Sequence, residues 1–171
     1  MKRMVVVLGV VGFVCAATVA AQAQEDLKKV AGWNGEWATE TQGRDTEAGE
    51  EWTFQGKAKQ HQVGEHFYVW NGKWTAPDGK DMKYLGVTGW DPAKKAYFGV
   101  GFRSDGYKET SVVTFGDGTV VYDVTGTSAT GEAVRVRCTW TVPKDKYEGK
   151  CETLTDGKWW HSSMEKGVRV K

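Results

Sequence analysis

The sequence lacks the patterns that mark the common enzyme classes. It has no G-x-S-x-G or H-E-x-x-H motif, no cysteine beside a plausible base, and no glycine-rich loop leading into a helix that could hold a phosphate. An excess of charge of one sign is also missing, because 23 basic residues stand against 22 acidic ones. We therefore predict no motif-based catalytic residue, no cofactor, and no nucleic-acid or anionic-membrane partner.

Long hydrophobic runs are absent except at the start of the chain. Lys2 and Arg3 precede an uncharged stretch, residues 4–20, which ends in small residues and an Ala21-Gln22-Ala23 cleavage signature. This is typical of a signal peptide, and the run is short for a membrane anchor, which needs about 20 apolar residues. We expect residues 1–23 to be removed and residues 24–171 to form one periplasmic or secreted domain.

Cysteine is scarce as well, and removal of the signal peptide takes Cys15 with it. The remaining pair, Cys138 and Cys151, is read first as a disulfide in an exported protein, with two buried thiols as the alternative. If Val142 and Tyr147 flank a four-residue turn, the two cysteines lie directly opposite each other on antiparallel strands. Opposed Cα atoms there are about 4.5 to 5.5 Å apart, which suits a disulfide.

The rest of the chain reads as short strands between frequent turns. Turn residues such as Asn71-Gly72 and Ser104-Asp105-Gly106 recur at short intervals, after a possible two-turn helix over Glu25 to Ala31. Sequential hairpins favour an antiparallel up-and-down meander, and its closure into a barrel would remove exposed edges. The ten expected strands are Gly35 to Thr41, Glu51 to His61, His66 to Lys73, Lys80 to Trp90, Ala96 to Arg103, Glu109 to Phe115, Thr119 to Thr127, Ala133 to Val142, Tyr147 to Leu154 and Trp159 to Val170.

Alternation within the strands indicates which residues share a face. The strand over Ala133 to Val142 places Val134, Val136, Cys138, Trp140 and Val142 on one side, so the disulfide should point inward. In Ala96 to Arg103, Phe98, Val100 and Phe102 oppose Tyr97, Gly99 and Gly101. Glycines of this kind favour sharp strand bending, as barrel closure requires.

The start of the first strand resembles the G-x-W signature of lipocalin-like, or calycin-type, barrels. Gly35 and Trp37 carry this resemblance, directly after the possible helix. In such barrels the tryptophan plugs the closed end and is covered by a cationic side chain from near the end of the domain. The resemblance assigns that structural role to Arg169, as a cation–π contact worth about 0.5 to 2 kcal/mol.

The wider layout resembles the bacterial family known as domain of unknown function 1579. The pattern Gly86-x-x-Gly89-Trp90-Asp91, followed by Lys94-Lys95-x-Tyr97, is similar to a mid-domain motif of that family, although Ala96 is inserted before the tyrosine. The resemblance covers most of the mature chain. It implies a barrel fold and almost nothing about function.

Tryptophan is unusually abundant, with nine in one small domain. Large rigid rings could simply fill a barrel interior, or they could line a pocket for a flat or apolar ligand, or stack on sugars. The candidate pocket-lining residues are Trp52, Trp70, Trp90, Trp140 and His161.

Other polar residues offer weaker candidates. His61 and His66 could approach each other across a turn that contains Glu65, although a solvated hairpin tip explains them equally well, and we predict no metal site. His161 is expected to share a strand face with Trp159, Ser163, Glu165 and Arg169. Asp123 is a loose candidate for an inward carboxylate.

Three functions remain open from the sequence. The leading hypothesis is an exported barrel, not an enzyme, that binds a small apolar or aromatic molecule in its interior. The second is a structural or interaction module with a packed core. The third is an enzyme acting on a small hydrophobic substrate, which would require an inward, buried histidine or carboxylate beside open volume.

Overall fold

The computed structural model describes residues 30–76 and 79–170. The expected signal peptide and residues 25–29 of the expected helix lie outside this part of the chain. The described chain opens with a single 3-10 turn, Val30–Trp33. Within the described residues no helix is long and apolar enough to cross a bilayer.

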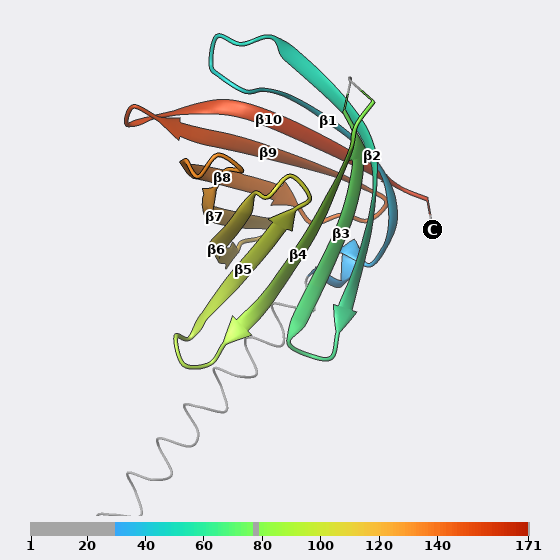
Figure 1. Ribbon diagram of the computed structural model, residues 1–171. Helices are drawn as coiled ribbons and strands as arrows, with labels where there is room; N and C mark the ends of the chain where they lie inside the picture. Colours follow the sequence, from blue (N-terminus) through green and yellow to red (C-terminus); the bar gives the residue numbers. More distant parts are fainter. Residues whose placement is uncertain (1–29, 77–78, 171) are drawn as a thin grey trace, which may run out of the picture.

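Ten antiparallel strands follow, and they confirm the predicted fold class. Each strand pairs with its neighbour in the chain, and β1 pairs with β10, so the sheet is a closed meander barrel (Figure 1). Every expected strand is present, with ends that differ by at most three residues. The strands are β1 (Gly35–Arg44), β2 (Glu51–Val63), β3 (Phe67–Thr75), β4 (Asp81–Asp91), β5 (Ala96–Arg103), β6 (Lys108–Phe115), β7 (Thr119–Thr127), β8 (Ala133–Thr141), β9 (Lys146–Thr155) and β10 (Lys158–Arg169).

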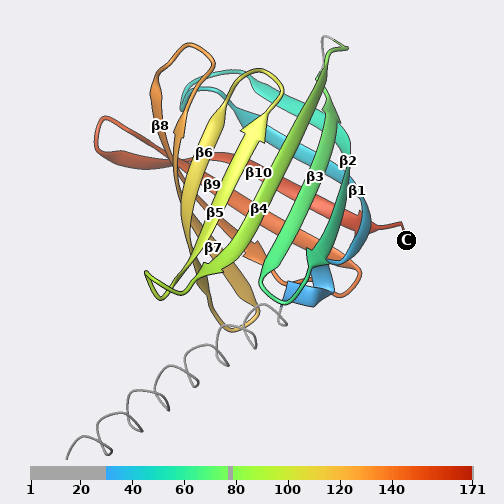
Figure 2. The ribbon, with the colours of Figure 1, turned by 60° about the horizontal axis from the view of Figure 1, so that its bottom comes forward.

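The barrel has two different ends. The 3-10 turn lies at the same end as the β2–β3 and β4–β5 connections, beside the end of β2, as Figure 2 shows. The β1–β2, β3–β4 and β5–β6 connections lie at the opposite end, and residues from all three line a chamber there. We call the end with the 3-10 turn the closed end and the end with the chamber the open end.

The predicted disulfide is confirmed. Cys138 and Cys151 are register partners on β8 and β9, with Cα atoms 4.1 Å apart, and their sulfur atoms are bonded. Both cysteines pack against the core, so the disulfide points into the barrel as expected. It cross-links two neighbouring strands from the inside.

Interior glycines lie beneath aromatic rings of the same or a neighbouring strand. A Cβ at Gly101 would overlap the Tyr84 side chain, and one at Gly149 would overlap the ring of Trp140. This explains the alternation in β5: its tyrosine and glycines face inward, whereas Phe102 faces outward with 55 % of its surface exposed. The interior cannot hold a large side chain at every position, so glycines make room for the rings.

Candidate functional site

The closed end is sealed by tryptophan and arginine. Trp37 is fully buried, its indole N–H donates to the Trp33 carbonyl, and the guanidinium of Arg169 lies 4.3 Å from its ring centroid. Arg169 also donates to the backbone carbonyls of Gly32, Asn34 and Lys144. The cation–π contact that the resemblance implied is thus present, and it ties both ends of the domain together.

A cavity of about 130 Å³ lies inside the barrel above this plug. Its wall is mainly aromatic and aliphatic, with a few polar side chains. We call it the inner cavity. The residues that line it include Trp33, Gln60, Trp70, Tyr84, Thr88, Glu109, Tyr122, Val124, Cys138 and Trp140.

A larger chamber of about 650 Å³ lies at the open end. It shares Trp70, Tyr84, Tyr107, Glu109 and Trp140 with the inner cavity, so the two spaces adjoin. We call it the mouth chamber. A molecule that reaches the inner cavity from the open end would pass through it.

Trp70 lies at the junction of the two spaces. Its ring makes edge-on contacts with Trp74, Tyr84 and Trp140, at centroid distances of 6.2, 5.4 and 5.5 Å. Edge-to-face packing of this kind holds rings in fixed orientations. The aromatic wall is therefore held in a fixed arrangement at this junction.

Two carboxylates point into the interior. Glu109 lines both spaces and accepts a hydrogen bond from Tyr84 at 2.5 Å. Burial raises the pKa of Tyr84, and the nearby Glu109 raises it further, so this hydroxyl remains a donor. Glu165 lines the mouth chamber with 5 % of its surface exposed, and it accepts hydrogen bonds from Tyr147 at 2.6 Å and Thr41 at 2.8 Å.

Burial raises the pKa of Glu165 above its ordinary value of about 4.5, and the hydrogen bonds from Tyr147 and Thr41 oppose that rise. The folded protein therefore keeps this proton at pH values where the unfolded chain has lost it. The contribution of Glu165 to stability is complete below about pH 4.5 and is lost as the pH rises towards the folded-state pKa.

Glu165→Gln should remove this part of the pH dependence, because glutamine stays neutral. We expect the free energy of unfolding of the variant to fall less than that of the wild type between about pH 4 and pH 8, measured by urea unfolding. Glu152→Gln, at an exposed position on β9, is the matched control and should follow the wild type. Parallel profiles for Glu165→Gln and the wild type would contradict the prediction.

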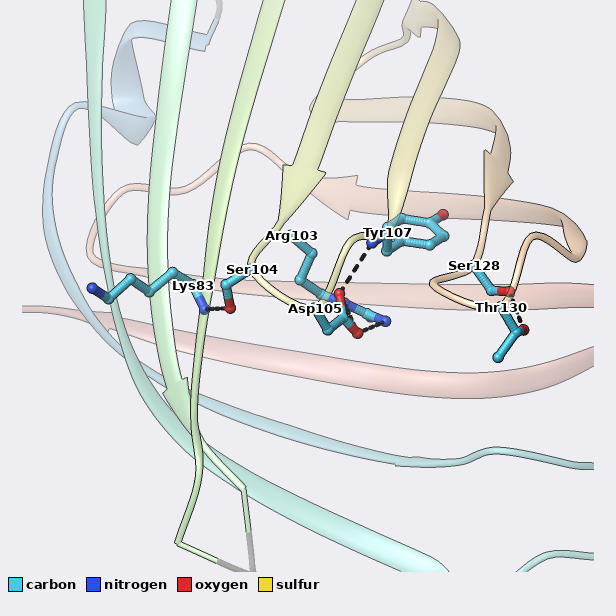
Figure 3. A network of polar contacts seen from close by, with 7 residues as sticks. All are labelled: Lys83, Arg103, Ser104, Asp105, Tyr107, Ser128 and Thr130. Atoms are coloured by element: carbon cyan, nitrogen blue, oxygen red, sulfur yellow. Dashed lines mark hydrogen bonds and ion pairs between the residues drawn. The ribbon is translucent and has the colours of Figure 1, made fainter.

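The rim of the open end is organised by the β5–β6 turn. Arg103 donates from Nε and Nη2 to the Asp105 carboxylate, and its guanidinium lies 4.8 Å from the ring centroid of Tyr107 (Figure 3). The bonds from Arg103 hold the pKa of Asp105 below its usual range. In the same view Ser104 accepts a hydrogen bond from the backbone of Lys83, joining this turn to β4. The positive charge of Arg103 is thus balanced by the Asp105 carboxylate at the rim.

The structure brings together only some of the predicted pocket residues. Trp70 and Trp140 line the inner cavity and the mouth chamber, and Trp52 lines the mouth chamber, where it stacks on Phe54. Trp90 lines neither space and packs edge-on against Tyr97.

His161 is exposed and lines neither space, which corrects its expected place. A β-bulge between His161 and Ser163 inserts Ser162, so the alternation changes sides within β10. Trp160 is buried on one side of the bulge and Glu165 on the other, while His161 faces outward. A bulge adds one residue without a partner, and a strict period of two cannot reveal it.

The expectation for Asp123 was also wrong. It lies on the outer face, where Arg137 donates to it at 2.8 Å and stacks on Trp159. His61 and His66 are exposed near the closed end. Among residues 30–76 and 79–170, no three His, Cys, Asp or Glu side chains gather as a metal site requires.

The sequence reasoning missed Glu109 and most of the interior tyrosines. Glu109 shares a face of β6 with Ser111, Val113 and Phe115, so the alternation that identified the inward residues of β8 could also have identified Glu109. In the sequence, a glutamate at the end of a strand is readily interpreted as part of the neighbouring solvated turn. The barrel interior, however, extends to the rim.

Comparisons with known proteins bear on the fold. The sequence matches no protein-family model, and no curated protein matches it. Among solved structures, the crystal structure of Rv2717c from M. tuberculosis aligns with a TM-score of 0.64 and 13 % identity, over 85 % of this chain and 98 % of that one. An S-type phycobiliprotein lyase, CPES from Guillardia theta, aligns with a TM-score of 0.45 and 15 % identity, over 83 % and 90 %. The chain therefore has the fold of a lipocalin-like, calycin-type barrel.

Proposed function

We propose that this protein binds a small molecule with an apolar or aromatic ring system in the interior of the barrel. The observation that carries the proposal is the inner cavity of about 130 Å³ that adjoins the mouth chamber. An apolar cavity of about 150 Å³ holds benzene. The inner cavity is close to this size and adjoins the chamber, so one ring would occupy it and the remainder of a larger ligand would lie in the chamber. This volume argues against the packed-core alternative.

The candidate contact residues are those at the junction and in the chamber. Trp70 and Trp140 would contact the ring, and Trp52 would contact the part of the ligand nearer the rim. Affinity would come from buried aromatic area, at about 25 cal/mol per Å² of apolar surface. Because the ring contacts within the wall already exist, little ordering would be needed on binding.

Filling the inner cavity tests the proposal. Val124 is buried on β7 and lines the cavity, whereas Val121 of the same strand faces outward. Val124→Phe should weaken binding of ethylbenzene, followed by tryptophan fluorescence or NMR, by at least about tenfold, and Val121→Phe should leave it unchanged. Native mass spectrometry of protein from its own host should also show a retained small molecule. Equal binding by both variants, or no binding by the wild type, would argue against an interior site.

Export and family membership complete the proposal. We propose that residues 1–23 are a signal peptide, which the disulfide between Cys138 and Cys151 supports, since disulfides persist in oxidising compartments. The protein would then be periplasmic or secreted, and mass spectrometry of the mature protein should find Gln24 at its N-terminus. Membership of the family known as domain of unknown function 1579 is a proposal that rests on the motif from Gly86 to Tyr97.

A catalytic role is the second candidate function. Glu165 supports it, because this carboxyl is inward, buried and beside the mouth chamber, as an enzyme of this type would need. Turnover of a bound molecule that Glu165→Gln abolishes without weakening binding would establish it. Binding without turnover would leave the protein a carrier.

A further inference from the structure

Three buried N–H groups around the inner cavity have no acceptor among the described residues. They are the indole N–H groups of Trp33 and Trp70 and the side-chain amide of Gln60. Gln60 is only 2 % exposed, and its carbonyl oxygen is already occupied by the Tyr68 hydroxyl at 3.0 Å. An indole can only donate, so each tryptophan needs an acceptor from elsewhere.

Other polar groups of the same cavity satisfy one another. Glu109 accepts from Tyr84, and Thr88 and Tyr122 are hydrogen-bonded to each other at 3.1 Å. Buried polar groups in folded proteins are almost always paired, and leaving one unpaired costs free energy. The three free donors thus distinguish this cavity from an apolar void.

We propose that the inner cavity selects ring molecules that carry a neutral hydrogen-bond acceptor, such as a ketone, lactone or quinone carbonyl or a ring nitrogen. This inference rests on the proposed function and specifies its ligand class. The acceptor end would enter first and accept from Gln60, Trp33 or Trp70, while the ring lies against the aromatic wall.

The charges in the interior explain why the acceptor is neutral. Glu109 lines the inner cavity and would repel a carboxylate or phosphate. No lysine or arginine is among the described residues that line the inner cavity; Arg169 contacts Trp37 and backbone carbonyls, and Arg103 of the mouth chamber pairs with Asp105. An anionic ligand would therefore be buried without a free cation, which is strongly unfavourable.

Three probes of similar shape test the inference: ethylbenzene, acetophenone and benzoate. Acetophenone presents a carbonyl where ethylbenzene has a methylene group, and benzoate presents an anion. In ¹H–¹⁵N NMR spectra of the wild type, acetophenone should shift an indole N–H signal of Trp33 or Trp70 downfield, and ethylbenzene should produce no such downfield shift. Benzoate should bind at least about tenfold more weakly than acetophenone.

A near-isosteric variant removes one donor. In a Tyr68→Phe background, where the hydroxyl bound to Gln60 cannot become a new donor in the cavity, Gln60→Met should lower the affinity for acetophenone relative to that for ethylbenzene by about fivefold, as expected for one neutral hydrogen bond. Gln62→Met is the matched control, because Gln62 is on the same strand and lines neither space. It should leave the affinity ratio unchanged.

The outcomes separate the inference from the function on which it rests. If ethylbenzene binds, acetophenone shifts no indole signal and Gln60→Met changes the affinity for both probes equally, the inference is overturned and interior binding stands. Water molecules would then be the acceptors for these donors. If none of the probes binds the wild type, both proposals fail.

Discussion

Trp37→Ala should lower the free energy of unfolding by about 3 to 5 kcal/mol, the largest effect we expect from a single substitution in this chain. The side chain is completely buried, and its ring is in edge contact with Tyr147 at 5.2 Å. The truncation would also leave the Arg169 guanidinium without its aromatic partner. For a domain of this size, the melting temperature should fall by roughly 10 °C.

Trp37→Phe separates the contributions at this site. It retains a ring beneath Arg169 but removes the indole N–H that donates to the Trp33 carbonyl. We expect a smaller loss, of about 1 to 3 kcal/mol, measured by urea unfolding with both variants in parallel. A loss below about 1 kcal/mol for Trp37→Ala would show that the plug is dispensable and that the account of the closed end is wrong.

Removal of the disulfide is the second large effect. The double variant Cys138→Ala/Cys151→Ala should lose up to about 3 kcal/mol, because the cross-link closes a short loop and restricts the unfolded chain. The wild type in a strong reductant should unfold at the same urea concentration as the double variant in its absence. The double variant itself should not respond to reductant.

The disulfide prediction has a second readout. Cys138 lines the inner cavity and Cys151 lines the mouth chamber, so truncation of both enlarges the interior. Ethylbenzene should therefore still bind the double variant at temperatures where it is folded. A stability unaffected by the double substitution would mean that the unfolded chain is already restricted at this hairpin.

The fold was predictable because local signals agreed along the whole chain. Most turn residues mark strand ends, although Asn71 and Gly72, also expected in a turn, are paired residues within β3. The length of the turn between β8 and β9 is enough to place Cys138 opposite Cys151. Barrel closure could not be read from any one strand. It was favoured by the resemblance at Gly35 and Trp37, by the glycines of the strand over Ala96 to Arg103, and by the removal of exposed sheet edges.

The candidate site was predictable only in part, for two physical reasons. Alternation divides a strand into two faces but does not say which one is inside; in β5 the smaller residues are inside because neighbouring rings fill the space. The bulge at Ser162 then reversed the faces of β10, moving His161 out and placing Trp160 inside. Unpaired donors such as the Trp70 N–H emerge only from the packed interior.

The seam between β1 and β10 has a consequence for how the chain is made. Trp37 lies opposite Arg169, so the first strand finds its second neighbour only once β10 has been made. Contacts between such distant positions are slow to form, because a long loop must close first. A chain that has emerged only as far as β9 could assemble a curved sheet but not seal it. Closure, and with it a complete binding cavity, should therefore wait for β10 to emerge.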